Sequence, residues 1–383
     1  MKFTYVPLLK TTDAELRAFS KVSAKARPHI CPFFELTKGK TFNNPSSKAH
    51  DIEGDLSKSV KLLRKKFALD TPFILSLTTE KKFQNNQIAN LLFNSKNGFS
   101  AWTGFLQELN MPNIIPSMVV DLSAPFEMIA QAQYLEEYYP RFVFRIQLNK
   151  SDLDDADGLA RVFYEIAKRL KDSTKMLGVL DLRYVEPKSY DKVLAAAKTF
   201  FNTLKASGIS KEHNFIVMSS SFPAVLKDEG LLSFSSLEFD LFKAISHEFS
   251  SDFILTYGDY AAIHPIRKDD GGGFWIPRVD YPTLNTMYYA RIRHYEMRKV
   301  VDAVTGQEVI RRKKFKEAKE AYREASILIK TCPGFGDKDC WGTDQIIDCS
   351  LGNCKSNIPS FWISVRANIH MTMMANVLKL FEA

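Results

Sequence analysis

The sequence has little of what marks an exported, membrane-bound or disordered protein. Only five cysteines occur among its 383 residues. The N-terminal MKFTYVPLLK carries one Lys before its apolar run and no small-residue cleavage site, so we expect a strand there and not a signal peptide. No apolar stretch approaches the length needed to span a bilayer. We therefore expect a soluble cytoplasmic protein with reduced thiols and no membrane partner.

The signatures of common enzyme classes are missing as well. The chain contains no Gly-x-Ser-x-Gly elbow, P-loop, His-Glu-x-x-His pair or Gly-rich dinucleotide fingerprint. A standard hydrolase, NTPase, metalloprotease or dehydrogenase is therefore not supported, and whether the protein is an enzyme stays open at this point.

Charge of one sign is in moderate excess. The formal net charge is +8 and the isoelectric point is near 9.0, which favours anionic partners such as nucleotides or nucleic acid. The densest basic run, residues 311–316, is followed by Glu317, Glu320 and Glu324. We expect these residues to form a charged helix over 312–329. We favour the interpretation that the exposed face of this helix only contacts water. The alternative is that this face binds nucleic acid.

Eight short apolar, β-rich runs are predicted to be strands. They cover residues 5–9, 30–36, 73–77, 117–122, 142–148, 177–182, 215–219 and 253–257. Helical patterns lie between them. Because parallel strands require crossover helices, this alternation predicts an α/β fold with a (β/α)8 TIM-type barrel. The alternative is an open doubly wound sheet, which would usually carry a Gly-rich turn after its first strand; YVPLLKTTDAE has none.

The pattern changes after residue 260. We divide the chain into a barrel, residues 1–260, and a C-terminal hairpin-plus-helix extension, residues 261–383. RKDDGGG is predicted to be a hairpin turn, and a strand through YYARIRHYEMRK precedes a turn at Thr305 and Gly306. A last amphipathic helix has Met373, Val377 and Leu380 along one side, and we expect that side to pack on the barrel.

Polar residues close several predicted strands, at the end where such barrels carry their sites. They are Lys10, Glu35, Asp121, Asp181, Arg183, Ser220 and Asp259. Glu35, Asp121 and Asp181 would be catalytic carboxylates or ligands of a divalent cation, while Lys10 and Arg183 would hold phosphate. With equal weight, the same charges could neutralise one another in a closed set of ion pairs.

Four cysteines fall within one stretch of the extension. They are Cys332, Cys340, Cys349 and Cys354. Four thiolates can complete a tetrahedral zinc site, but this spacing is unlike that of common zinc knuckles. Buried or free thiols are the favoured alternative, and beyond a divalent cation at the barrel mouth the sequence names no cofactor.

Several of these segments resemble the Beta protein family of bacterial mobile elements and phage satellites. The likeness runs nearly end to end and rests on YVPLLKTTDAELRAF, PFFEL, VVDL, VLDLR, GDYAAIHP, ARIRHY, CWGTD and WISVRANIH. It adds family-typical positions to those of the strand ends. These are Arg291, Arg293, Trp341, Asp344, Trp362, Arg366 and His370. The final segment has IHMTMM where the family pattern has a second His, which puts a metal or acid–base role for His370 in doubt.

The resemblance implies that the extension folds back over the barrel mouth. Arg293, Trp341, Trp362 and Arg366 would then suit a flat anionic ligand through stacking and bidentate contacts. The family is similar to the beta component of gop, beta, cll loci, so we expect a binding component of a phage-defence or toxin-control system. It would recognise a nucleotide, nucleic acid or a partner protein from the same locus. The alternative is a metal-assisted, hydrolase-like enzyme acting on a phosphorylated or nucleotide substrate.

Overall fold

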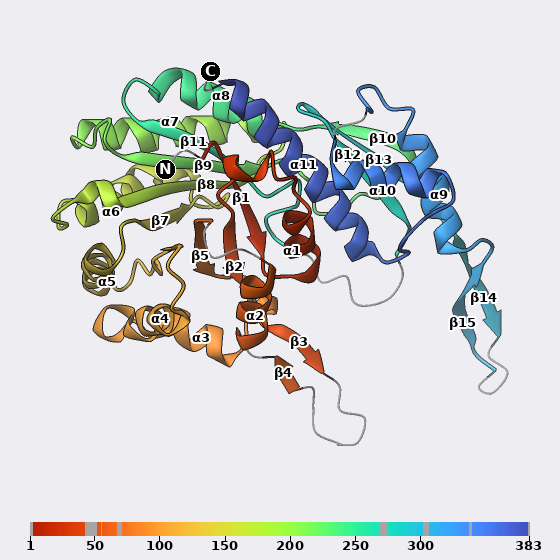
Figure 1. The fold of residues 1–383 in the computed structure, drawn as a ribbon, viewed down its shortest axis with the longest axis horizontal. Coiled ribbons are helices and arrows are strands. Elements are labelled where there is room, and N and C mark those ends of the chain that lie inside the picture. Colours follow the sequence, from red (N-terminus) through yellow and green to blue (C-terminus); the bar gives the residue numbers. More distant parts are fainter. Residues whose placement is uncertain are drawn as a thin grey trace.

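The computed structural model describes residues 3–42, 52–54, 56–66, 71–267, 275–301, 306–336 and 339–381. An eight-stranded parallel sheet, closed into a barrel, occupies its centre (Figure 1). The barrel strands are β1 (Tyr5–Lys10), β2 (Phe33–Leu36), β5 (Phe73–Leu77), β6 (Ile114–Pro116), β7 (Phe142–Gln147), β8 (Met176–Tyr184), β9 (Asn214–Ser220) and β11 (Ile254–Asp259). They are neighbours in chain order and β11 returns to β1. A single bridge between Ser117 and Val143 joins β6 to β7, which confirms the predicted (β/α)8 barrel.

Helices surround this barrel. They are α1 (Asp13–Ser20), α2 (Leu56–Lys66), α3 (Asn86–Phe93), α4 (Lys96–Leu109), α5 (Pro125–Tyr138), α6 (Ala156–Ala167), α7 (Tyr190–Ala206), α8 (Glu238–Phe249) and α11 (Pro359–Phe381). Short 3-10 turns lie at η1 (Arg27–His29), η2 (Lys81–Phe83), η3 (Leu153–Asp155) and η4 (Ser173–Lys175). None of the described helices is long and apolar enough to cross a membrane.

The last helix, α11, takes the place of the eighth barrel helix. It packs on α1 and β1, although residues 260–358 separate it from β11 (Figure 1). Its Met371, Met374 and Leu378 belong to the same hydrophobic core as the barrel wall. The predicted stripe is therefore displaced by part of a turn, since Leu380 is exposed while Met373 and Val377 are only partly buried.

The remaining elements form two hairpins, one small sheet and two helices. The hairpins are β3 (Gly39–Phe42) with β4 (Ile52–Gly54), and β14 (Tyr295–Val301) with β15 (Glu308–Lys314). β10 (Gly230–Ser235), β13 (Thr286–Arg291) and β12 (Arg278–Pro282) pair in that order as an antiparallel sheet. α9 (Ala318–Ile329) and α10 (Trp341–Ser350) complete a second hydrophobic core with β12, β13 and the start of α11.

Three predicted elements were wrong in their bounds. The strand expected through YYARIRHYEMRK is two strands of different sheets, because β13 ends at Arg291 and β14 begins at Tyr295. The fourth strand was expected at 117–122, but β6 ends at Pro116 and only Ser117 adds a bridge beyond it. Met118 and Val119 are buried beside a cleft, whereas Val120 and Leu122 are exposed. The helix expected over 312–329 is two elements, because residues through Lys314 pair with β14 before α9 begins at Ala318. The predicted RKDDGGG turn, apart from its first residue Arg267, and Thr305 are outside the described part of the chain.

Gly178 on β8 tests the packing between the barrel wall and its helices. A Cβ there would overlap the ring of Phe215 and lie 3.2 Å from that of Phe163. We expect Gly178→Ala to lower the free energy of unfolding by about 1–3 kcal/mol because the rings must shift. Gly104→Ala on α4 is the control, since no neighbouring atom lies within 4 Å of its added Cβ. Urea unfolding followed by circular dichroism compares the two; equal midpoints would contradict the close packing.

Candidate functional site

Four charged side chains fill the top of the barrel at the C-terminal ends of its strands. Lys10, Glu35, Arg145 and Asp181 are each at most 7% exposed. Each of them follows, two positions later on the same strand, an apolar residue of the barrel interior. These apolar residues are, in the same order, Leu8, Phe33, Val143 and Val179. Because side chains alternate along a strand, these four point into the same space.

The guanidinium of Arg145 joins the strands at this level. It donates from Nη1 to Glu35 Oε1 at 2.6 Å and from Nη2 to Asp181 Oδ2 at 2.7 Å. Lys10 binds the other Glu35 oxygen and lies 2.9 Å from Glu80 Oε1. Tyr260 donates its hydroxyl to Asp181 at 2.6 Å. Every oxygen of Glu35 and Asp181 therefore already has a partner.

Electrostatics follows from these contacts. Burial alone would raise the pKa of Glu35, but the charges of Lys10 and Arg145 outweigh it and lower that pKa to about 2. Burial would lower the pKa of Arg145, yet Asp181 and Glu35 hold it well above its ordinary value. Glu35 is thus held in its ionised form, and a cation could reach Glu35 or Asp181 only by displacing Lys10 or Arg145.

Arg183 is the least engaged cation of the mouth. Its backbone is left-handed, with φ of 57°, where the pairing of β8 with β9 becomes irregular. Its backbone N–H donates to Asp181 Oδ1 at 3.0 Å, and its Nη1 lies 3.4 Å from the Tyr260 hydroxyl. The buried Nε has no hydrogen-bond partner among the described residues. Such strain and unused donor capacity at a barrel mouth are typical of ligand sites.

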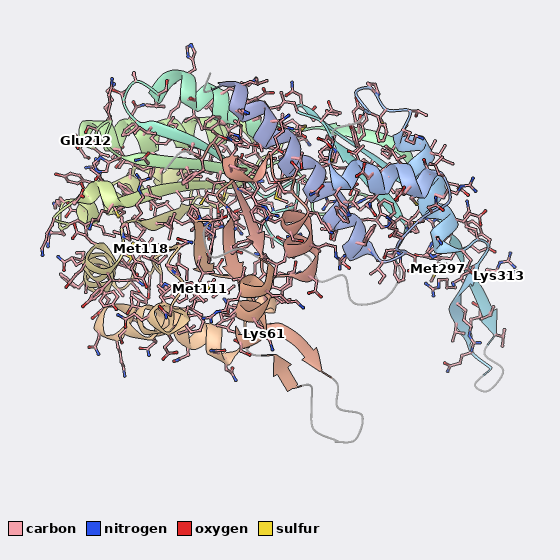
Figure 2. All side chains as sticks on the ribbon, viewed as in Figure 1. Lys61, Met111, Met118, Glu212, Met297 and Lys313 are labelled. Atoms are coloured by element: carbon pink, nitrogen blue, oxygen red, sulfur yellow. The ribbon has the colours of Figure 1, made fainter. Side chains whose placement is uncertain are left out.

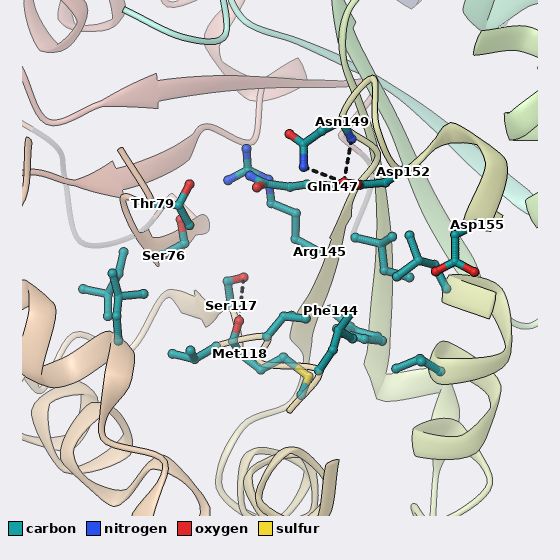
Figure 3. A pocket seen from close by; sticks show the side chains of 18 of the residues that line it. Ser76, Thr79, Ser117, Met118, Phe144, Arg145, Gln147, Asn149, Asp152 and Asp155 are labelled. Carbon is teal, nitrogen blue, oxygen red and sulfur yellow. Dashed lines mark hydrogen bonds between the residues drawn. The ribbon is translucent and has the colours of Figure 1, made fainter. Parts of the chain in front are cut away.

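Two hollows open beside this network. The larger, about 580 Å³, lies at the ends of β5, β6 and β7, where Arg145 reaches toward Thr79 while Ser117 and Met118 line the β6 side (Figure 3). The smaller, about 320 Å³, lies at the end of β8 and is lined by Arg183, Tyr184 and Ser189. Asn149 and Ser151, in the loop after β7, line both. The two hollows are therefore neighbours across one loop.

Asp259 and His370 do not face the barrel mouth. They lie outside the wall, between β11 and α11, where His370 Nε2 is 2.6 Å from Asp259 Oδ2. Asp259 also accepts hydrogen bonds from the hydroxyls of Tyr5 at 2.6 Å and Tyr257 at 2.9 Å. Burial would raise the pKa of Asp259, but the contact with His370 lowers it. This buried set fastens α11 to the barrel.

Arg366 is placed one helical turn before His370 and binds a different element. Its Nη1 is 2.5 Å from Asp280 of β12, and its guanidinium lies 4.0 Å from the centre of the Phe222 ring. Burial lowers the pKa of Arg366 to about 10. Arg366 therefore joins α11 to the small sheet, at the seam between the barrel and the extension.

The other residues expected over the mouth are elsewhere. Trp362 stacks on Tyr322 with ring centres 4.9 Å apart and is 3% exposed, inside the second core. Trp341 packs edge-on against Phe361, in the same core. Trp362 is therefore enclosed by that core, whereas Trp341 is partly buried at its edge.

Arg291 at the end of β13, Arg293 in the connection that follows it, and two strand-end residues are also away from the ion pairs. Arg293 is exposed and pairs with Glu229 at 2.7 Å, and Arg291 binds the backbone carbonyl of Lys227. Ser220 donates to the carbonyl of Ile263 at 3.0 Å. Asp121 lies in the loop before α5, where its carboxylate accepts from Ser123. Of the three carboxylates predicted to be catalytic, the structure thus brings Glu35 and Asp181 together through Arg145, whereas Asp121 lies apart from them.

The four cysteines of the extension are buried in its core. Cys349 and Cys354 share a side-chain hydrogen bond, which lowers the pKa of Cys354 to about 7. Cys340 instead lies 3.1 Å from the hydroxyl of Thr343. Within the described residues, no three His, Cys, Asp or Glu side chains are grouped so that they could hold a metal ion.

Sequence reasoning missed three members of the network, Arg145, Glu80 and Tyr260. One signal was present: FVFRIQ places Arg145 at an alternate position of an apolar strand, where an unpaired charge would be costly. Glu80 and Tyr260 lie in loops just past β5 and β11, and only the fold brings them to Lys10 and Asp181.

Removing one charge from the network should destabilise the protein strongly. We expect Asp181→Asn to lower the free energy of unfolding by about 3–5 kcal/mol, because Arg145 loses one of its two buried counter-charges. Asp154→Asn is the matched control, since its pair with Lys192 is 81% exposed on the Asp side and should contribute under about 1 kcal/mol. Denaturant unfolding measures both; similar losses would contradict the buried network.

The depressed pKa of Glu35 should appear in the pH dependence of stability. A carboxyl with a folded pKa of about 2 stabilises the fold above its ordinary pKa of 4.5, and that contribution is lost as pH falls through 2. The parent should lose stability over this window, whereas Glu35→Gln should be less stable at pH 6 and depend less on pH below 4.5. Thermal unfolding from pH 6 to pH 2 compares them; parallel profiles would rule out the proposed charge state.

Comparisons with known proteins agree with the likeness seen in the sequence. Residues 5–376 match the family described as Beta protein. The chain is 24% identical over 373 residues to the protein named Protein beta of Enterobacteria phage P4, which covers 96% of this chain and 92% of that one. No solved structure matches the chain. The chain belongs to the Beta protein family.

Proposed function

We propose that the protein is the binding component of a phage-defence or toxin-control system and that it recognises a nucleotide at the barrel mouth. The observation that carries this proposal is the pair of neighbouring hollows, the smaller of which is lined by Arg183, whose Nε has no hydrogen-bond partner among the described residues. A hollow of about 580 Å³ is within the size range of small-molecule sites.

The two hollows offer different chemistry. The larger has apolar walls from Leu77, Val119 and Phe144, with Gln147 and Asn149 as polar groups, and it could hold a base. The smaller has Arg183 and lies at the start of α7, beside Ser189. A guanidinium and a helix N-terminus both favour an anion, so we assign the phosphate to this side.

A binding role is preferred to catalysis for a chemical reason. Arg145 and Lys10 neutralise Glu35 and Asp181, and the carboxylate of Asp121 accepts a hydrogen bond from Ser123 in its own loop. A metal-assisted reaction would need carboxylates with oxygens available to the cation. The mouth supports recognition of an anion better than activation of water.

Isothermal titration with AMP, ATP and inorganic phosphate tests the proposal. Ser151→Trp should reduce nucleotide affinity at least tenfold, because this exposed residue stands between the two hollows. Arg183→Gln should reduce it by roughly tenfold through loss of a charged hydrogen bond to phosphate. Ser210→Trp, exposed in the loop before β9 at the other end of the barrel, should bind as the parent does.

The outcomes separate the two functions. Binding of nucleotide by the parent, with the nucleotide recovered unchanged, supports a binding component. Hydrolysis during the titration favours the enzyme, and no binding of any of the three probes by the parent removes the proposal.

A further inference from the structure

The β14–β15 hairpin projects from the molecule as a two-stranded ribbon. Figure 1 shows it beyond the rest of the extension, and Figure 2 places Met297 and Lys313 on it, far from the barrel. Its strands pair in antiparallel register from Tyr295 opposite Lys314 to Val301 opposite Glu308. Among the described elements, each strand contacts chiefly the other. Both faces of the ribbon are therefore open to solvent.

Much of the chain's net positive charge lies in this ribbon and directly after it. Residues 295–316 hold seven Lys and Arg against three Asp and Glu, which supplies half of the formal net charge of +8. Alternation distributes the cations of the paired strands evenly over the two faces. One face has Arg298, Arg311 and Lys313. The other has Lys299, Arg312 and Lys314.

Nearby acids compensate these cations only weakly. The ion pairs of this segment are Arg298–Glu296 at 2.6 Å, Lys299–Glu308 at 3.3 Å, Lys314–Glu317 at 3.5 Å and Lys316–Glu324 at 2.6 Å, and their side chains are 22–76% exposed. Exposed pairs of this kind contribute about 0–1 kcal/mol and are screened by salt. Arg298 also lies directly opposite Arg311, an unfavourable like-charge pairing in a ribbon that has little else to stabilise it. A polyanion would relieve that repulsion.

We propose that this ribbon is an arm that binds double-stranded DNA. The major groove of B-DNA is about 12 Å wide and admits a two-stranded β-ribbon. A groove presents phosphates on both sides of an inserted element, so cations on both faces are used there, whereas a flat anionic surface would meet only one face. The major groove of A-form RNA is too deep and narrow for such an insertion.

The arm binds phosphates and does not read a particular sequence. Its exposed side chains are mainly Lys, Arg and apolar residues such as Met297 and Val301. Phosphate contacts position a protein on DNA and give affinity that falls steeply with salt, without distinguishing bases. This site is separate from the barrel mouth and does not depend on the nucleotide proposed there.

Fluorescence anisotropy with a labelled 25-base-pair duplex, from 50 to 300 mM NaCl, tests the arm on the full chain. The variant R298Q/R311Q/K313Q should bind at least tenfold more weakly at 100 mM NaCl, with a log–log salt slope smaller by about 2.7, for three lost phosphate contacts. The control K168Q/K192Q/K205Q removes the same charge from exposed lysines of the barrel helices. It should change affinity less than threefold.

Two further variants keep the test decisive. R298K/R311K/K313R retains the charges and should restore binding, which excludes a misfolded hairpin as the cause of the loss. Ser151→Trp should bind DNA as the parent does. Failure of the parent to bind duplex DNA at 50 mM NaCl, equal losses in the triple variant and its control, or tighter binding to double-stranded RNA or single strands would overturn the proposal. Capture of an acidic protein in place of DNA would do so too.

Discussion

The guanidinium of Arg145 is the contact on which the barrel mouth depends. It bridges Glu35 of β2 and Asp181 of β8 across the interior, and Lys10 of β1 extends the network to Glu80. Taking such ions out of water costs several kcal/mol each, and only close pairing offsets that cost. The strands must therefore keep a register that brings alternate positions of β1, β2, β7 and β8 to one level. The network occupies the centre of the mouth, and the two hollows open at its side.

A second set of buried polar contacts determines where the chain after the barrel can lie. Asp259 holds His370, and one turn earlier on the same helix Arg366 holds Asp280. Because residues four apart lie on one face of a helix, α11 binds the barrel wall and the small sheet at once. The family-typical residues Trp362, Arg366 and His370 thus each contact another element of the protein, and these contacts give them a role in the fold.

Charged side chains are arranged differently in the barrel interior and on the β14–β15 hairpin. Inside the barrel, cations and carboxylates are matched and buried, whereas on the β14–β15 hairpin cations exceed acids and face solvent. A net charge of +8 therefore says little by itself, since its location decides what it can attract. The mouth offers a guanidinium to one small anion, and the hairpin offers a row of cations to an extended one.

Local patterns in the sequence were sufficient for the architecture. Eight apolar runs alternating with amphipathic helices determine a parallel barrel, because hydrophobic periodicity is a property of neighbouring residues. Period-two alternation likewise brings Glu35 and Asp181 inward, since both share a face with apolar interior residues. Only the tertiary structure decided which side chains and strands contact one another. Asp259 faces outward with Tyr257, Arg145 completes the network from a strand more than a hundred residues from Glu35, and the basic run becomes a strand by pairing with β14. These outcomes depend on contacts between distant segments, which no local pattern encodes.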